Sequence, residues 1–270
     1  MDPIDRSEFF RRVRRRPFGG RLSGGEVAGC KTILDHWENG HGGEDDRWLA
    51  YLLGTAFHET AGTMVAIHEY GGAAYFERRY GPQTMVGQAL GNIKAGDGAR
   101  FHGRGFVQLT GRANYADWSM RLNLDLLAEP DLALRPDIAA QILIDGAILG
   151  TFTGRRLSDY FGKTANDWFG ARRIINRLDR ARDIAALAKQ FWAAIVHEES
   201  GQVSQAPWRD VLRQDSVGED VRFLQGLLGL AQDARFGPIT RDAVEAVQRF
   251  ADLAPDGIVG RRTWRVLLSP

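Results

Sequence analysis

The chain has 270 residues, enough for one large domain or for a large and a small domain with buried cores. Hydrophobic residues make up 44% and charged residues 26%, as in ordinary globular proteins, and the net charge of +1 gives no general reason to expect nucleic-acid or membrane binding. Cys30 is the only cysteine, which excludes an internal disulfide and a cysteine-rich metal site.

The first elements in chain order are two short helices within residues 5–38. Arginines between Arg11 and Arg16 interleave with Phe9, Phe10 and Val13, a pattern typical of an amphipathic helix. No long apolar run follows, so we expect neither a secretory signal peptide nor a membrane-spanning helix.

The second of these helices has a clear start signal, since Ser23 and Glu26 have the spacing of a capping box. The segment 63–91 lacks clear periodicity, and long irregular segments of this kind are often functional. Residues 134–160 and 164–196 again have helical periodicity. No stretch alternates convincingly as a strand, so we predict an all-α first domain.

A central apolar helix within residues 50–62 carries one glutamate. Leu52, Ala56 and Glu59 stand at i, i+4 and i+7, which places the carboxyl group on the face that should meet the core. Burial without a countercharge favours a protonated carboxyl group, and this is the form that donates a proton to a glycosidic oxygen. The alternative is that Glu59 reaches solvent from the last turn and merely ends the helix.

Residues 103–115 contain the sharpest motif, in which Gly103 and Gly105 flank an arginine and allow the backbone to approach a ligand closely. Gln108, Asn114 and Tyr115 add amide and aromatic groups that suit a hydroxylated sugar. The motif follows no predicted strand and lacks the later glycine of a dinucleotide fingerprint, so we exclude phosphate binding.

The C-terminal part of the chain contains a weak internal repeat, in which 236–244 and 256–264 share a turn glycine and a helix start. We predict a small three-helix domain, too poor in buried polar residues to be catalytic. The expected organisation is a catalytic domain over 1–198, a linker over 199–215 and the small domain over 216–270.

Two motifs now indicate a family. His58-Glu59-Thr60 and the run from Gly103 to Gly111 together resemble glycoside hydrolase family 19, which has a chitinase-like fold within the lysozyme-like superfamily. The segments 18–23 and 71–76 resemble the phage endolysin branch. Residues 216–270 resemble the peptidoglycan-binding type 1 domain. These resemblances cover nearly the whole chain.

The resemblance implies roles for particular residues. Glu59 matches the general acid of the family. His58, Gln108, Tyr115 and Asn176 are expected among the substrate-binding residues, although the two residues after Asn176 depart from the family pattern.

The second acid is expected at Glu69, because residues 67–72 resemble the endolysin pattern and precede glycines that could open a cleft. Glu77 is the other candidate, but the arginines that follow it favour an ion pair. The implied mechanism is inversion, in which Glu59 protonates the leaving oxygen and Glu69 activates a water molecule. Inversion predicts carboxyl groups roughly 6.5–9.5 Å apart.

The function implied is hydrolysis of the β-1,4 bond between N-acetylmuramic acid and N-acetylglucosamine in bacterial peptidoglycan, with no cofactor and no metal. We expect a monomeric endolysin that binds no nucleic acid, stays in the host cytoplasm until lysis, and reaches the periplasm and wall with the help of a holin.

Several alternatives stay open at this point. The protein could be a chitinase, a lytic transglycosylase that leaves an anhydro sugar, or an inactive cell-wall sugar-binding protein. A zinc peptidase using His58, Glu59, His68 and His102 is less well supported, because no His-Glu-x-x-His motif is present.

Overall fold

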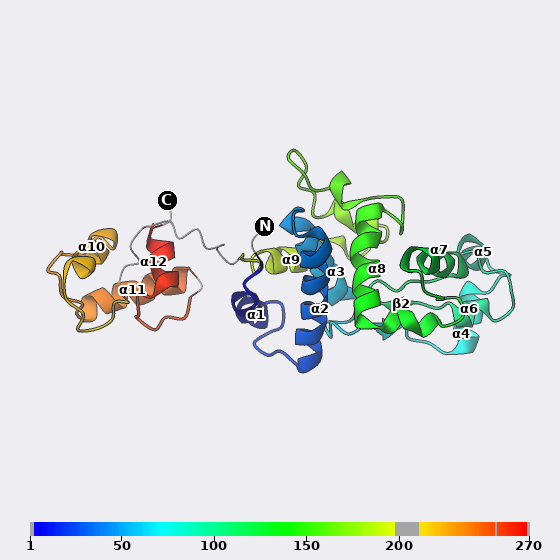
Figure 1. The fold of residues 1–270 in the computed structure, drawn as a ribbon, viewed down its shortest axis with the longest axis horizontal. Helices are drawn as coiled ribbons and strands as arrows, with labels where there is room; N and C mark the ends of the chain where they lie inside the picture. Colours follow the sequence, from blue (N-terminus) through cyan, green and yellow to red (C-terminus); the bar gives the residue numbers. More distant parts are fainter. Residues whose placement is uncertain (1–2, 198–210, 252, 269–270) are drawn as a thin grey trace. The chain divides into compact units, whose positions relative to one another are not determined.

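The computed structural model describes residues 3–197, 211–251 and 253–268. The chain divides into two compact units, Met1–Ser200 and Gly201–Pro270. Both units consist mainly of helices, and the two strands in the described residues have two residues each (Figure 1). The prediction of a helical first domain followed by a small helical domain is confirmed.

The core of the first unit is built around α3 (Asp46–Glu59), in which every residue from Leu49 to Ala56 is buried. Such a helix must be covered on all sides. Its neighbours include α2 (Gly24–His41), α8 (Pro136–Leu149) and α9 (Ala181–Trp192) (Figure 1). A β-carbon on Gly54 would lie 2.7 Å from the backbone nitrogen of Ala188, so glycine is required for the close contact between α3 and α9.

The N-terminal elements agree with the sequence pattern. Helix α1 (Arg6–Arg15) buries Phe9 and Val13 against the core, as expected for an amphipathic helix. At the start of α2, the Ser23 hydroxyl accepts the Glu26 amide at 3.2 Å, and the Glu26 carboxylate accepts the Ser23 amide at 2.6 Å. The predicted capping box is therefore confirmed.

The segment 63–91 is more regular than its sequence indicates. It contains β1 (Ile67–His68), α4 (Ala73–Tyr80) and α5 (Met85–Ala89). These elements are too short to show a hydrophobic period. Next come α6 (Asp97–Arg100), β2 (Arg104–Gly105) and α7 (Arg112–Leu122). Strands β1 and β2 pair antiparallel, with Ile67 opposite Gly105.

The helices expected over 134–160 and 164–196 are shorter than predicted. Helix α8 ends at Leu149, because Gly150 adopts a left-handed conformation with φ of 77°. Short 3-10 helices precede and follow α8 in the chain: η1 (Pro130–Leu134), η2 (Leu157–Asp159) and η3 (Gly170–Ile174). Helix α9 begins only at Ala181.

The second unit contains α10 (Glu219–Leu227), α11 (Pro238–Phe250) and α12 (Arg261–Leu268), as the prediction of three helices requires. Among its described residues, the buried core side chains are those of Leu212, Val221, Leu224, Phe236, Val244, Val259 and Trp264. Of the predicted linker, 199–215, residues 199–210 lie outside the described part of the chain. Leu212 belongs to the core and forms a β-bridge with Val259.

The internal repeat of the second unit is built on two buried glutamines. The Gln225 side chain donates to Asp233 Oδ1 at 2.7 Å and to the carbonyl oxygen of Arg235 at 3.0 Å, and it accepts the amide of Ala234. Gln248 does the same with Asp256, Ile258 and Gly257, at 2.9, 2.9 and 3.0 Å. Each glutamine thus fixes the loop before the next helix, and these buried polar groups are structural.

No helix in residues 3–197, 211–251 and 253–268 is both long and apolar enough to cross a membrane.

Candidate active site

Glu59 is the last residue of α3, and it is not a lone acid. Arg172 of η3 donates from Nη1 to Glu59 Oε1 at 2.8 Å. The Arg172 side chain is 4% exposed and that of Glu59 is 19% exposed, so the carboxyl group lies where buried structure meets solvent. The expectation of a buried acid without a countercharge is wrong, because a residue more than a hundred positions away supplies one.

The turn after Glu59 is fixed by Thr60. The Thr60 hydroxyl donates to the carbonyl oxygen of Ala56 at 2.7 Å and accepts the Met64 amide at 3.0 Å. This side chain is buried, so it holds the end of α3 in one conformation. His58 is half-buried, and in the described part of the chain no hydrogen bond joins its ring to Glu59.

Glu69 follows β1 and is held by the neighbouring strand. Its amide donates to the carbonyl oxygen of Gly103 at 2.8 Å, and its Oε2 accepts the Gly103 amide at 3.2 Å. Tyr80 donates its hydroxyl to Glu69 Oε1 at 2.8 Å. Burial, and then the hydrogen bond to Glu69, raises the pKa of Tyr80, so the phenol remains a proton donor to the carboxylate.

Gln108 lies near Glu69, and both side chains pack against Gly103. A β-carbon on Gly103 would lie 2.8 Å from Gln108 Oε1 and 3.2 Å from the Glu69 β-carbon, so glycine allows the two side chains to approach. Gln108 Nε2 donates to the carbonyl oxygens of Gly105 and Ile67 at 3.1 and 3.3 Å. The structure therefore brings together Glu69 and Gln108, two residues that sequence reasoning placed in the site.

Two histidines form a stack next to Glu69. His102 Nδ1 lies 2.6 Å from the carbonyl oxygen of Ala99, which can only accept, so this nitrogen carries a proton. The other ring nitrogen, Nε2, lies 3.0 Å from His68 Nδ1. Phe76 stacks on His102 with 4.5 Å between ring centroids. Burial lowers the pKa of His102, which favours the neutral ring that accepts from His68.

The zinc alternative receives no support from this arrangement. Within the described residues, no group of three metal-ligating side chains includes His58, Glu59, His68 or His102.

Tyr115 does not line a cleft. Its side chain is 0% exposed, and its hydroxyl accepts from Arg104 Nη1 and donates to the carbonyl oxygen of His102, both at 3.0 Å. Burial raises the pKa of Tyr115 to about 12. Arg104 in turn pairs with Asp131 at 2.7 Å. The prediction that Tyr115 contacts substrate is corrected, because the residue has no free surface and instead holds Arg104 and the His102 backbone.

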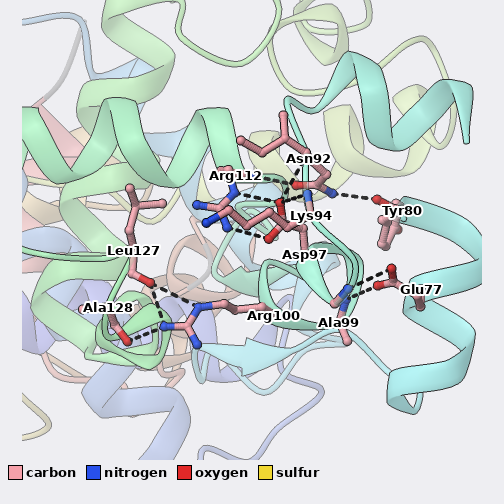
Figure 2. A network of polar contacts seen from close by, with 12 residues as sticks. Glu77, Tyr80, Asn92, Lys94, Asp97, Ala99, Arg100, Arg112, Leu127 and Ala128 are labelled. Atoms are coloured by element: carbon pink, nitrogen blue, oxygen red, sulfur yellow. Dashed lines mark hydrogen bonds and ion pairs between the residues drawn. The ribbon is translucent and has the colours of Figure 1, made fainter. Parts of the chain in front are cut away.

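The carboxylate of Glu77 is bound by two backbone amides. Its Oε1 accepts the Gly96 amide at 3.0 Å and its Oε2 accepts the Ala99 amide at 3.3 Å. Figure 2 shows the Glu77 carboxylate turned toward the backbone of α6 rather than toward an arginine. The expected ion pair with Arg78 or Arg79 is therefore corrected: the carboxylate fixes the start of α6.

The same region contains a buried ion pair, between Asp97 and Arg112 (Figure 2). The hydrogen bond from Arg112 lowers the pKa of Asp97 to about 2, helped by the amides of Ile93 and Lys94. Asn92 joins this pair to α4, since it donates to the carbonyl oxygen of Tyr80 at 2.7 Å. The backbone that carries Tyr80, and through it Glu69, is thereby fixed.

Asn176 is exposed and lies one turn after Arg172, whose carbonyl oxygen accepts the Asn176 amide at 3.0 Å. Its Oδ1 accepts the Arg177 amide at 2.8 Å. Asn176 lines a surface pocket of about 600 Å³ together with Thr153, Arg155, Arg173, Ile175, Arg177 and Leu178. The residue is thus available to a ligand, and it is linked through the backbone to the partner of Glu59.

Comparison with known proteins finds a matching family for a segment of each unit. Residues 27–149 match the family described as chitinase class I, and residues 217–267 match the peptidoglycan binding domain. The first match covers Glu59, Glu69 and Gln108. It ends before Arg172 and Asn176.

Curated relatives include endochitinase A2 of Pisum sativum, 28% identical over 108 residues, which are 39% of this chain and 33% of the relative. An endochitinase of Phaseolus vulgaris is 27% identical over 137 residues, 48% of this chain and 42% of the relative. The chain thus spans less than half the length of these relatives.

Among solved structures, chitinase C of Streptomyces griseus is 18% identical, with a TM-score of 0.42, over 71% of this chain and 91% of that protein. A TM-score this low supports no detailed comparison.

The first unit therefore contains a helical domain of the glycoside hydrolase class. More specifically, the chain carries a chitinase class I domain of glycoside hydrolase family 19, followed by a peptidoglycan binding domain.

Proposed function

We propose that this protein hydrolyses the glycan of bacterial peptidoglycan, at the β-1,4 bond between N-acetylmuramic acid and N-acetylglucosamine. The observation that carries the proposal is the combination of a family 19 domain with a peptidoglycan binding domain in one chain. The second domain would keep the first on the wall, where linkage raises the effective concentration of the substrate.

In this mechanism Glu59 is the general acid and Glu69 the general base. Glu59 is anchored through one oxygen by Arg172, and within the described residues nothing donates to its other oxygen. That oxygen is the one available to a glycosidic oxygen. Glu69 is held by Tyr80 and Gly103 and would activate the attacking water molecule. Gln108 and Asn176 supply amide groups that suit the acetamido and hydroxyl groups of the sugars.

Mass spectrometry of fragments released from purified peptidoglycan tests this proposal. We expect wild-type protein to release fragments that end in a reducing N-acetylmuramic acid, and Glu59→Gln to release none above background. Glu44→Gln is a matched control, because Glu44 is an exposed glutamate of the same unit. Its products should equal those of the wild type.

Other products would contradict the proposal and indicate a different activity. A reducing N-acetylglucosamine would indicate a glucosaminidase, and an anhydro end a transglycosylase. Cleaved stem peptides would contradict glycan hydrolysis altogether. Wall binding without any product from the wild type would indicate a sugar-binding protein.

A chitinase is the second candidate, because the curated relatives are named endochitinases. The same assay with chitin oligomers decides between the two. Faster hydrolysis of chitin oligomers than of peptidoglycan would favour the chitinase.

We also infer that the protein acts as an endolysin that reaches the wall through a holin. The support is the wall-binding domain and the single buried Cys30, which suits a reducing compartment. Expression in a bacterial cytoplasm should lyse cells only when a holin is co-expressed. Lysis at the same rate without a holin would contradict this inference.

A further inference from the structure

A cluster of two imidazoles and one carboxylate lies between α2 and α8, helices that run side by side (Figure 1). His36 and His41 belong to α2, and Asp145 belongs to α8. His41 Nε2 lies 2.9 Å and His36 Nε2 lies 3.6 Å from the same oxygen, Asp145 Oδ1. The ligand atoms of all three side chains lie within 4.8 Å of one another.

The 2.9 Å between His41 Nε2 and Asp145 Oδ1 is a hydrogen-bond distance, whereas the 3.6 Å from His36 Nε2 is longer than a hydrogen bond, and both are compatible with a shared metal ion. Zinc binds imidazole nitrogen and carboxylate oxygen at about 2.0–2.2 Å, so the ligand atoms of a tetrahedral site lie roughly 3.3 Å apart. The two measured separations from Asp145 Oδ1 fall on either side of that value. Both histidines also present the same nitrogen, Nε2, to one point.

The surroundings hold the three groups in place. The ring of His41 packs against that of Trp37, with 5.8 Å between centroids, and Trp37 is buried. Gln141 of α8 hydrogen-bonds the Asp145 carboxylate. Partners of this kind orient the ligands of known metal sites. Each of the three side chains is between 22% and 28% exposed, so water can complete the coordination.

We propose that His36, His41 and Asp145 bind one divalent transition-metal ion, with zinc as the expected ion. Two imidazoles and one carboxylate favour zinc or its first-row neighbours over calcium and magnesium, which prefer oxygen ligands. A bound ion would fasten α2 to α8 at the end of α2. None of the three residues belongs to the candidate active site, so the ion would act structurally.

The test uses the full chain, stripped with a chelator and titrated with zinc chloride by calorimetry. We expect one equivalent to bind with a dissociation constant in the micromolar range or tighter. At 100-fold excess over that constant, the melting temperature of the first unit should rise by about 5–10 °C. No binding at 1 mM zinc, or no rise in melting temperature, would overturn the proposal.

Variants locate the site. Asp145→Asn keeps the shape of the side chain, and we expect it and His36→Ala each to weaken zinc binding at least tenfold. His68→Ala is the matched control, because it removes an exposed imidazole from the other close histidine pair. Its affinity should equal that of the wild type. Weaker zinc binding in His68→Ala together with unchanged binding in Asp145→Asn would contradict the assignment.

A measurement on the wild type alone guards against variants that fail to fold. X-ray absorption at the zinc edge should show scattering from two imidazole rings. Scattering from one ring or none would count against the site.

Discussion

Helices α3 and α4 each place one glutamate near a backbone turn, yet the two carboxylates have different surroundings. Both oxygens of Glu77 accept backbone amides of the α6 region. Glu59 has one oxygen bound by Arg172, and among the described residues the other oxygen has no donor. A carboxylate saturated by the backbone is committed to structure, whereas one anchored at a single oxygen is held in position and keeps its other oxygen for a ligand.

The glutamates of this chain can be ordered by that criterion. Glu8 is saturated by Arg11 and Arg12, and Glu26 closes a helix cap. Glu69 lies between these cases: both of its oxygens accept hydrogen bonds, but one of the two donors is the Tyr80 side chain rather than the backbone. The following changes test this ordering, beginning with the largest effect.

Glu69→Gln should lower the rate of peptidoglycan hydrolysis by about 10²- to 10⁴-fold, the usual contribution of a general base. Glu77→Gln should keep the rate within a few-fold of the wild type and lower the free energy of unfolding by about 1–2 kcal/mol, because an amide group replaces one acceptor. Clearing of a cell-wall suspension and denaturant unfolding measure the two effects. If Glu77→Gln lost the activity and Glu69→Gln lost only stability, Glu77 would be the second acid and the proposed ordering of the glutamates would be wrong.

Arg172→Met should lower the free energy of unfolding by about 3 kcal/mol, because it leaves Glu59 without the charge beside it. Arg173→Met is the matched control at the exposed neighbouring position and should cost under about 0.5 kcal/mol. The loss of unfolding free energy caused by Arg172→Met should be smaller when Glu59→Gln is also present, because no unpaired carboxylate is then left. Equal losses with and without Glu59→Gln would show that packing, not the ion pair, is the source.

Glu8→Gln should cost about 1–3 kcal/mol at pH 7, and the cost should depend on pH. The hydrogen bond from Arg11, the largest of several causes, holds the pKa of Glu8 at about 2, below its ordinary value of 4.5. A lowered pKa stabilises the fold above pH 4.5, and this contribution is lost as the pH falls toward 2. Unfolding curves for both proteins should therefore converge over that interval. A constant difference would exclude the ion pairs as its cause.

Glu26→Ala should give the smallest effect, about 0.5–1 kcal/mol of unfolding free energy, by opening the capping box of α2. Glu26→Gln keeps an acceptor at the same position and should be close to neutral. Thermal unfolding of the two variants checks this, and a similar loss in both would mean that the charge rather than the hydrogen bond matters.

The sequence predicted the elements whose signals are local. The capping box at Ser23 and Glu26, the buried central helix and the three helices of the second unit need only neighbouring residues to be recognised. Helices α4 and α5 were missed, because elements of eight and five residues are too short to establish a period.

The site was less predictable, because Glu59 and the arginine that binds it are far apart in the sequence. Arg172 stands 113 positions after Glu59, among several arginines, and no spacing distinguishes it from Arg173 or Arg177. Tyr115 was misread for a related reason: an aromatic residue in a motif looks the same whether its hydroxyl meets a sugar or a buried arginine. Gln108 was expected in the site from its motif, and the structure places it near Glu69, while its contact with substrate stays a prediction.

The repeated glutamines of the second unit have a consequence for how that unit folds. Thr240, which accepts from Gln225 at 3.2 Å, lies in the first turn of helix α11, and the same helix carries Gln248. One helix therefore completes the first copy of the repeat and supplies the anchor of the second. Neither copy can be removed without taking away part of the other, so we expect the second unit to fold as a single cooperative step rather than as two separable halves.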